Sequence, residues 1–152
     1  MAPRSRIICI GSRLIDIDAA GPRVFDRLAA RPLPAGVAAV DGGRMGVDLA
    51  RFLDDIERAV FVDAVEGFAP QGSLVELSAD EAAAAAPRSY GHAGGLPFLL
   101  GHLAHLVDGP APSIVVLGIE GPATDDLIAR AAERSLALAT TGEIRDGASV
   151  RV

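Results

Sequence analysis

The sequence has few of the features that mark an exported or disulfide-stabilised protein. Cys9 is its single cysteine in 152 residues, so no internal disulfide can form. Because Cys9 lies in the apolar run 7–10, it is interpreted as a small core residue in a reducing compartment. No apolar run approaches the roughly eighteen residues of a membrane span, and the N-terminus lacks a signal-peptide core. We therefore expect a cytoplasmic protein with no membrane partner.

Positive charge is also scarce. The chain has 14 Lys and Arg residues against 20 Asp and Glu, which gives a net charge of −6 and a pI near 4.9. The basic residues are scattered and form no stripe, so nucleic acid is not expected as a partner. The length fits one domain over residues 1–152, which would bury roughly two-thirds of the surface of the unfolded chain.

Three catalytic signatures are missing as well. Gly11 has no second and third glycine at dinucleotide spacing, so the nucleotide-binding fingerprint is absent. The sequence contains neither a Gly-x-Ser-x-Gly elbow nor a His-Glu-x-x-His helix. These absences remove motif support for a dinucleotide enzyme, a serine hydrolase and a zinc protease of those types.

The segments that are present alternate between strand-like and helical patterns. Residues 59–65 form an almost unbroken apolar run, which is typical of a strand covered on both faces. The other expected strands are 7–10, 37–40, 73–77 and 113–117, and the expected helices begin near Pro22, Met45, Leu96 and Thr124. This order predicts a three-layer α/β/α sandwich around a mainly parallel twisted sheet.

Finer expectations concern the connections. Residues 41–43 are predicted to form a turn, and residues 73–77 alternate as an edge strand would. That strand should be the one antiparallel strand, because the loop before it is too short for a crossover. Residues 80–87 fit a short helix or a flap, and the tail from Gly142 fits a ragged end or a short strand.

Carboxylates follow the strands at the edge where ligands bind in open α/β sheets. They are Asp18, Asp41, Asp63 and Glu120. If the strands are parallel, these acids should converge, and their mutual repulsion would favour a bound cation. An imidazole from His92 would complete a donor set that suits nickel, zinc or iron better than magnesium.

Simpler interpretations stay open for each of these residues. A single Asp at a strand end is as often a helix cap or an ion-pair partner as a metal ligand, and His92 in a glycine-rich loop could be solvated. His102 and His105 could form a second metal pair, but they lie opposite the leucine face of the expected helix. A solvated helix surface is the favoured interpretation for these two histidines.

The order of these features resembles the hydrogenase maturation endopeptidases, which trim the C-terminal extension from the large subunit of nickel-iron hydrogenase. The similar segments run from about residue 7 to residue 138. They are Ile10-Gly11-Ser12-Arg13-Leu14, Asp18-Ala19-Ala20-Gly21-Pro22-Arg23, Asp41-Gly42-Gly43 with Gly46, Val62-Asp63-Ala64, His92 with Gly95-Leu96 and Leu99-Leu100, and Gly118-Ile119-Glu120.

The resemblance implies a function and a site. In this family the metal is bound by an acid of the first loop, the Asp of the central strand and a later histidine. The corresponding residues of this sequence are Asp18, Asp63 and His92. The metal would be nickel carried by the hydrogenase large-subunit precursor, although zinc or cadmium could occupy the same site. The turn Asp41-Gly42-Gly43 would lie close to the cleaved bond and supply the catalytic residues. The implied enzyme is an endopeptidase of aspartic type or one that depends on nickel for recognition.

This chain departs from the family at four positions. The usual Gly-x-Gly-Asn is replaced by Cys9-Ile10-Gly11-Ser12, and the usual pair of acids by Ile17-Asp18. Arg44 stands where Thr normally follows the glycines. These departures motivate an alternative, a metal-binding or partner-binding protein of the same fold that does not cut. A third interpretation, a nucleotide or small-ligand enzyme, rests on fold analogy alone.

Overall fold

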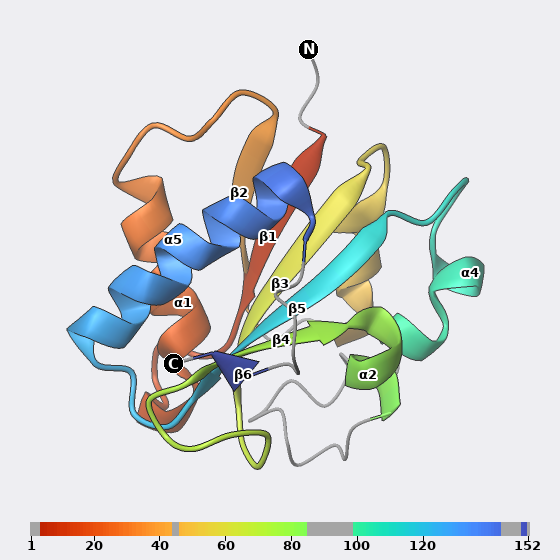
Figure 1. Ribbon diagram of the computed structural model, residues 1–152. Coiled ribbons are helices and arrows are strands. Elements are labelled where there is room, and N and C mark those ends of the chain that lie inside the picture. The colour runs from red at the N-terminus through yellow and green to blue at the C-terminus, as the bar shows by residue number, and fades with distance from the viewer. Residues whose placement is uncertain (1–3, 44–45, 85–98, 144–149, 152) are drawn as a thin grey trace.

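The computed structural model describes residues 4–43, 46–84, 99–143 and 150–151 (Figure 1). In chain order its elements are β1 (Ser5–Ile10), the 3₁₀ helix η1 (Asp16–Asp18), α1 (Ala20–Ala29), β2 (Val37–Gly43), the 3₁₀ helix η2 (Gly46–Leu53), β3 (Arg58–Val65), β4 (Leu74–Ser78), α2 (Ala79–Ala84), α4 (Leu103–Leu106), β5 (Ser113–Glu120), α5 (Asp125–Thr141) and β6 (Val150–Arg151). Among the described helices, none is long and apolar enough to cross a membrane.

The strands form one six-stranded sheet in the order β2-β1-β3-β5-β4-β6. The strands β2, β1, β3 and β5 run parallel, whereas β4 is antiparallel to both β5 and β6. The prediction of a mainly parallel sheet with one antiparallel strand is confirmed. The prediction of an edge strand at residues 73–77 is wrong, because β6 pairs with the outer side of β4 and four of the five β4 residues are buried.

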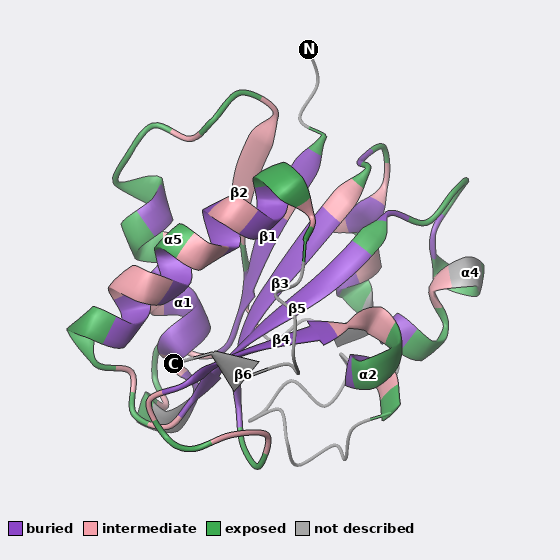
Figure 2. Cartoon of the chain, in the orientation of Figure 1, coloured by how far each residue is buried: buried purple, intermediate pink, exposed green. Residues whose placement is uncertain are grey.

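Helices cover both faces of the sheet, which confirms the three-layer arrangement (Figures 1 and 2). The helices α1 and α5 pack on one face, around a core that includes Cys9, Val62 and Leu117. On the other face, η2 and α2 pack around a core that includes Phe61 and Val116. We call these the α1/α5 face and the η2/α2 face.

The strand β3 contributes to both cores because successive side chains of a strand point to opposite sides. Val60, Val62 and Ala64 belong to the core of the α1/α5 face. Phe61 and Val65 belong to the core of the η2/α2 face. This alternation places Asp63, which lies between Phe61 and Val65, on the η2/α2 face.

Two strands are longer than their sequence patterns predict. Residues 41–43 continue β2 instead of forming a turn, and a bulge accommodates Gly42, because Cys9 pairs with Asp41 while Ile10 pairs with Gly43. The strand β5 continues through Gly118 to Glu120. In both places a glycine within the segment suggested the end of the strand, yet pairing with a neighbouring strand continues past it.

The helix predicted from residue 45 is a 3₁₀ helix, η2, and its start at Met45 lies outside the described residues. The apolar spacing nevertheless identified the buried side chains, since Leu49, Leu53 and Ile56 are at most 7% exposed. Residues four apart share a face in an α-helix, whereas in a 3₁₀ helix the side chains three apart are aligned. Periodicity therefore predicted the buried side but not the helix type.

The helix predicted to begin near Leu96 is helical at residues 99–101 and again in α4. Leu99 and Leu100 are buried, whereas Leu106 is 37% exposed, so the predicted leucine face ends before Leu106. Leu96 lies outside the described residues. Both His102 and His105 are exposed, as the solvated interpretation expects.

The predicted start of the last helix is confirmed. The Thr124 hydroxyl caps α5 by accepting a hydrogen bond from the Leu127 N–H at 3.2 Å. Asp125 and Asp126 occupy the first turn, where the helix dipole favours negative charge.

Candidate functional site

The Asp63 carboxylate is fully buried near the end of the central strand β3. Neither of its oxygens has a hydrogen-bond partner among the described residues. Burial raises the pKa of Asp63 well above its usual value, and the nearby charge of Asp18 raises it further. The Ala64 amide opposes this shift in part but does not satisfy hydrogen-bond geometry. A carboxyl group in this state takes up a proton or a cation at low cost.

The second member of the site is Asp18. It is the last residue of η1, and η1 contacts β3. Its side chain is fully buried, and Oδ2 accepts a hydrogen bond from the Ser12 N–H at 2.9 Å. Its Oδ1 has no partner among the described residues. The loop is packed tightly here, since a Cβ atom on Gly11 would lie 2.1 Å from the Asp18 carbonyl oxygen. The close packing fixes the position of the Asp18 carboxylate.

Asp18 and Asp63 therefore form a pair of buried carboxylates with three unpartnered oxygens, which we call the acid pair. Two like charges at this depth are unfavourable unless a cation or a proton lies between them. The donor chemistry fits a divalent metal ion with open positions. His92, the third predicted ligand, lies outside the described residues, and those that are described contain no group of three His, Cys, Asp or Glu side chains able to hold a metal.

Glu120 does not join the acid pair. Its Oε2 accepts hydrogen bonds from the backbone N–H groups of Phe68 and Ala69, at 2.6 and 2.9 Å. Glu120 is 3% exposed, so its carboxylate anchors the loop after β3 from a buried position. The sequence correctly predicted an acid at this edge of the sheet. It could not indicate that the Glu120 carboxylate accepts hydrogen bonds from backbone amides.

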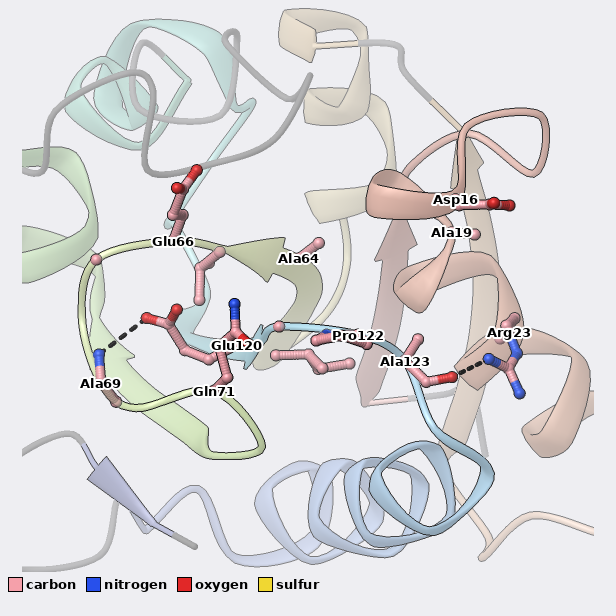
Figure 3. A pocket seen from close by; sticks show the side chains of 14 residues that line it. Asp16, Ala19, Arg23, Ala64, Glu66, Ala69, Gln71, Glu120, Pro122 and Ala123 are labelled. Atoms are coloured by element: carbon pink, nitrogen blue, oxygen red, sulfur yellow. Dashed lines mark hydrogen bonds between the residues drawn. The ribbon is translucent and has the colours of Figure 1, made fainter.

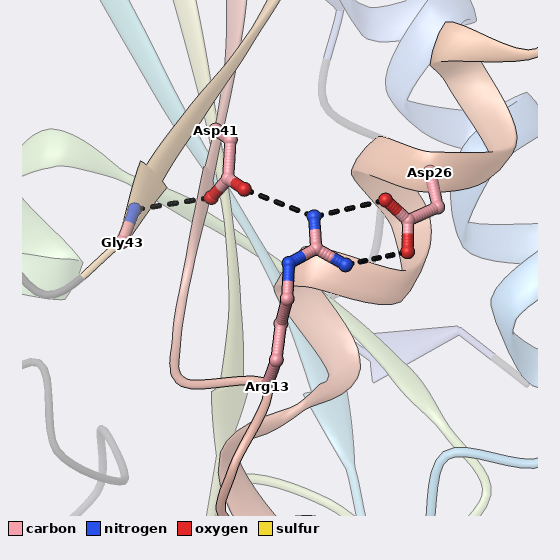
Figure 4. A network of polar contacts seen from close by, with 4 residues as sticks. All are labelled: Arg13, Asp26, Asp41 and Gly43. Atoms are coloured by element: carbon pink, nitrogen blue, oxygen red, sulfur yellow. Dashed lines mark hydrogen bonds and ion pairs between the residues drawn. The ribbon is translucent and has the colours of Figure 1, made fainter.

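Asp41 also points elsewhere (Figure 4). It pairs in register with Cys9, whose side chain belongs to the α1/α5 core, so Asp41 lies on the face opposite to that of Asp63. Its Oδ2 accepts a hydrogen bond from Arg13 at 3.0 Å, and its Oδ1 accepts one from the Gly43 N–H at 3.2 Å. The prediction that four acids converge in one crevice is therefore wrong, because only the acid pair comes together.

The two glycines after Asp41 have different roles in β2. A Cβ atom on Gly42 would lie 2.9 Å from Leu49 Cδ2 and 3.2 Å from the Cys9 carbonyl oxygen, so this position has no room for a side chain. Gly43 has φ of +57° and open space around it, which identifies it as the position where the bulge turns the backbone. Their predicted catalytic role, with that of Asp41, stays a prediction, and Arg44 lies outside the described residues.

A cavity of about 810 Å³ opens at the carboxyl ends of β3 and β5 (Figure 3). Ala64, Ala69, Ile119 and Pro122 give it an apolar lining. Acidic side chains of the lining are Asp16, Glu66 and Glu120. Asp18 and Asp63 are not part of the lining, although Asp16 and Ala64, which lie close to them in sequence, are.

No motif in the sequence predicts this cavity. Its wall includes the loop residues Gln71 and Gly121, which no motif singles out. Arg23 lies on the opposite side and donates to the Ala123 carbonyl oxygen and to Asp125 (Figure 3). The sequence feature that could have indicated the cavity is a loop after a buried strand, because ligands bind at that edge of open sheets.

Cys9 has no place in the reaction chemistry of this site. Its thiol is buried in the sheet, and burial raises its pKa above the ordinary value. A thiol in this environment is inert, which agrees with its interpretation as a core residue.

Comparison with known proteins identifies similar sequences and structures. A curated relative, the hydrogenase expression/formation protein HupD of Rhodobacter capsulatus, is 38% identical over 80 residues, which are 51% of this chain. The chain covers 38% of that relative's length. No family model matches the sequence.

Among solved structures, the hydrogenase maturating endopeptidase HybD from E. coli is similar with a TM-score of 0.74 and 24% identity, covering 91% of this chain and 94% of HybD. A hydrogenase 2 maturation peptidase from a Thaumarchaeota archaeon has a TM-score of 0.59 and 29% identity, covering 91% and 98%. The chain thus has the fold of the hydrogenase maturation endopeptidases.

Proposed function

We propose that this chain is an endopeptidase of hydrogenase maturation, which removes the C-terminal extension of a nickel-loaded large-subunit precursor. One observation carries the proposal: two buried carboxylates, Asp18 and Asp63, have three oxygens that find no hydrogen-bond partner within the described parts of the chain. The names of the similar proteins, a maturation peptidase among them, support the reaction class.

In this proposal the nickel ion belongs to the substrate. The unpartnered oxygens of the acid pair would serve as ligands, and His92 would be the third. A precursor without metal would leave two carboxylates facing each other without a counter-charge, which disfavours its binding. Recognition through the metal would therefore distinguish loaded from unloaded precursor and place the scissile bond beside the site.

Cleavage of the precursor tests this proposal directly. We expect one new C-terminus when the precursor carries nickel and none when the same precursor lacks it, because the metal supplies the counter-charge for the acid pair. Intact mass of both forms after incubation with the protein gives the result. Equal cleavage of both forms would exclude recognition through nickel, and cleavage of neither would exclude the peptidase.

The cavity at the carboxyl ends of β3 and β5 is the proposed seat of the peptide segment next to the cleaved bond. Gln71 lies at its wall and is exposed, so Gln71→Trp should narrow it without disturbing a core. We expect KM for the loaded precursor to rise about fivefold to tenfold with kcat little changed, since binding alone is weakened. Steady-state cleavage rates measure the two constants.

A matched control for this variant is Ser113→Trp. Ser113 is exposed and lies at the amino end of β5, away from the carboxyl ends where the cavity opens. The control should retain the KM of the unchanged protein. An equal rise in KM for both variants would mean that the cavity has no part in binding.

A second candidate function is a protein of this fold that holds a metal-loaded partner without cutting it. The position of Asp41 favours it, because its carboxylate lies on the face opposite to Asp63 and is bound to Arg13. A stable complex with the loaded precursor whose mass stays unchanged would support this function. A new C-terminus on the precursor would exclude it.

A further inference from the structure

Arg13 joins three parts of the structure: its own loop, α1 and β2 (Figure 4). It lies in the loop between β1 and η1, five residues before Asp18. Its guanidinium donates to both carboxylate oxygens of Asp26 in α1, at 2.6 and 2.9 Å, and to Asp41 in β2, at 3.0 Å. Arg13 thus ties the loop that carries Asp18 to α1 and to the end of β2.

The backbone adds a second link at the same place. The Gly11 N–H donates to the Gly43 carbonyl oxygen at 2.9 Å, so a backbone hydrogen bond joins the loop to β2 two residues after Asp41. The Ser12 N–H, between Gly11 and Arg13, donates to the Asp18 carboxylate. A displacement of Arg13 would therefore move the donor that orients Asp18.

We propose that Arg13 is a positioning residue, and that Asp41 acts through it by fixing the loop that presents Asp18 to the metal. The expected effect of Arg13 on precursor cleavage rests on the proposed function. The contacts of Arg13 with Asp26 and Asp41 concern only this chain. Asp41 is then not the group that activates water. Its carboxylate faces α1, whereas Asp63 lies on the other face of the sheet.

The pKa of Asp26 agrees with a fixed contact between Asp26 and the Arg13 guanidinium. Hydrogen bonding to Arg13 holds the pKa of Asp26 below its usual value, so this carboxylate stays charged at neutral pH. Planar bidentate pairing of this kind restricts the guanidinium more than a single contact does. A lysine at this position would retain the charge but could not hold both carboxylates with the same geometry.

The test uses Arg13→Gln, Asp41→Asn and the double variant. We expect each single variant to weaken Ni²⁺ binding about tenfold, in line with the effect of partners that orient metal ligands. The double variant should lose no more than either single variant, because both changes break one tie. Titration calorimetry with Ni²⁺ gives the affinities, and amide hydrogen exchange of residues 12–18 reports the loop without any metal.

The matched control is Arg31→Gln. Arg31 pairs with Glu133 on the surface, and its side chain is 46% exposed against 47% for Arg13. This control should leave both the Ni²⁺ affinity and the loop exchange unchanged. Arg13→Lys should recover only part of the affinity, since lysine cannot pair with two carboxylates in a plane.

The outcomes separate this inference from the proposed function. A normal Ni²⁺ affinity and normal loop exchange in Arg13→Gln would overturn the positioning role, whatever the precursor does. A fall in kcat for Asp41→Asn at unchanged Ni²⁺ affinity, additive with Arg13→Gln, would instead make Asp41 a catalytic residue. Failure of the unchanged protein to cleave the loaded precursor would overturn the proposed function alone.

Discussion

Asp63→Asn should abolish nickel binding and at the same time make the metal-free protein more stable at neutral pH. The variant removes one of the two proposed carboxylate ligands. We expect a loss above about a hundredfold in nickel affinity, since removal of a residue that only orients a ligand already costs up to that much. Stability should rise because a fully buried carboxylate, which no described residue satisfies by a hydrogen bond, is replaced by a neutral group of similar shape. Chemical unfolding and nickel titration measure the two effects.

The pH dependence follows from the raised pKa of Asp63. A carboxyl group with a pKa higher in the folded state than in the unfolded state binds more protons when folded. Its contribution to stability is present below the unfolded pKa, near ~3.9, and is lost as pH rises through the folded pKa.

Unfolding free energies of the metal-free protein at several pH values between 4 and 8 check this result. The difference between Asp63→Asn and the unchanged protein should grow as pH rises. Asp108→Asn, at an exposed position, serves as the control and should show no such trend. A difference that is constant over this range would show that Asp63 does not titrate as its burial requires.

Arg134→Met should destabilise the protein by about 3–5 kcal/mol, because it leaves a buried carboxylate without its counter-charge. Arg134 of α5 donates to both carboxylate oxygens of Glu76 in β4, at 2.7 and 2.9 Å. The Glu76 side chain is 1% exposed and that of Arg134 is 13% exposed. Urea unfolding monitored by circular dichroism measures the loss.

The control for this prediction is Arg130→Met, one turn earlier in the same helix. Arg130 pairs with Asp126, whose side chain is 80% exposed, so the loss should stay below about 1 kcal/mol. The double variant Arg134→Met with Glu76→Leu should regain most of the stability, since an apolar pair can replace a buried ion pair. A double variant as unstable as Arg134→Met would mean that packing, not charge, explains the effect.

The sequence predicted Asp63 well because its signal is local. An apolar run with one carboxylate near its end indicates both a buried strand and a polar group that needs a partner. Asp18 was a candidate because it lies in the loop after the first expected strand, and the resemblance implied its role as a metal ligand. The structure places it near Asp63. The role of both as nickel ligands stays a prediction.

The partners of the other acids could not be predicted in the same way. Glu120 binds two amides of a loop 51 and 52 residues away, and Asp41 binds an arginine 28 residues away. Glu76, in a strand expected at an edge, is buried against Arg134, 58 residues away. Contacts of this sequence separation depend on how strands are ordered in the sheet, and periodicity carries no information on that order.

The sequence by itself determined which segments are strands and helices, which of their residues are apolar, and that carboxylates gather at one edge of the sheet. Only the tertiary structure decided which face each acid occupies and what it meets there. The physical reason is that strand side chains alternate, so a shift of one residue or a single bulge moves a carboxylate to the other face. Asp41 and Asp63 lie near the same edge of one sheet, but this alternation separates them.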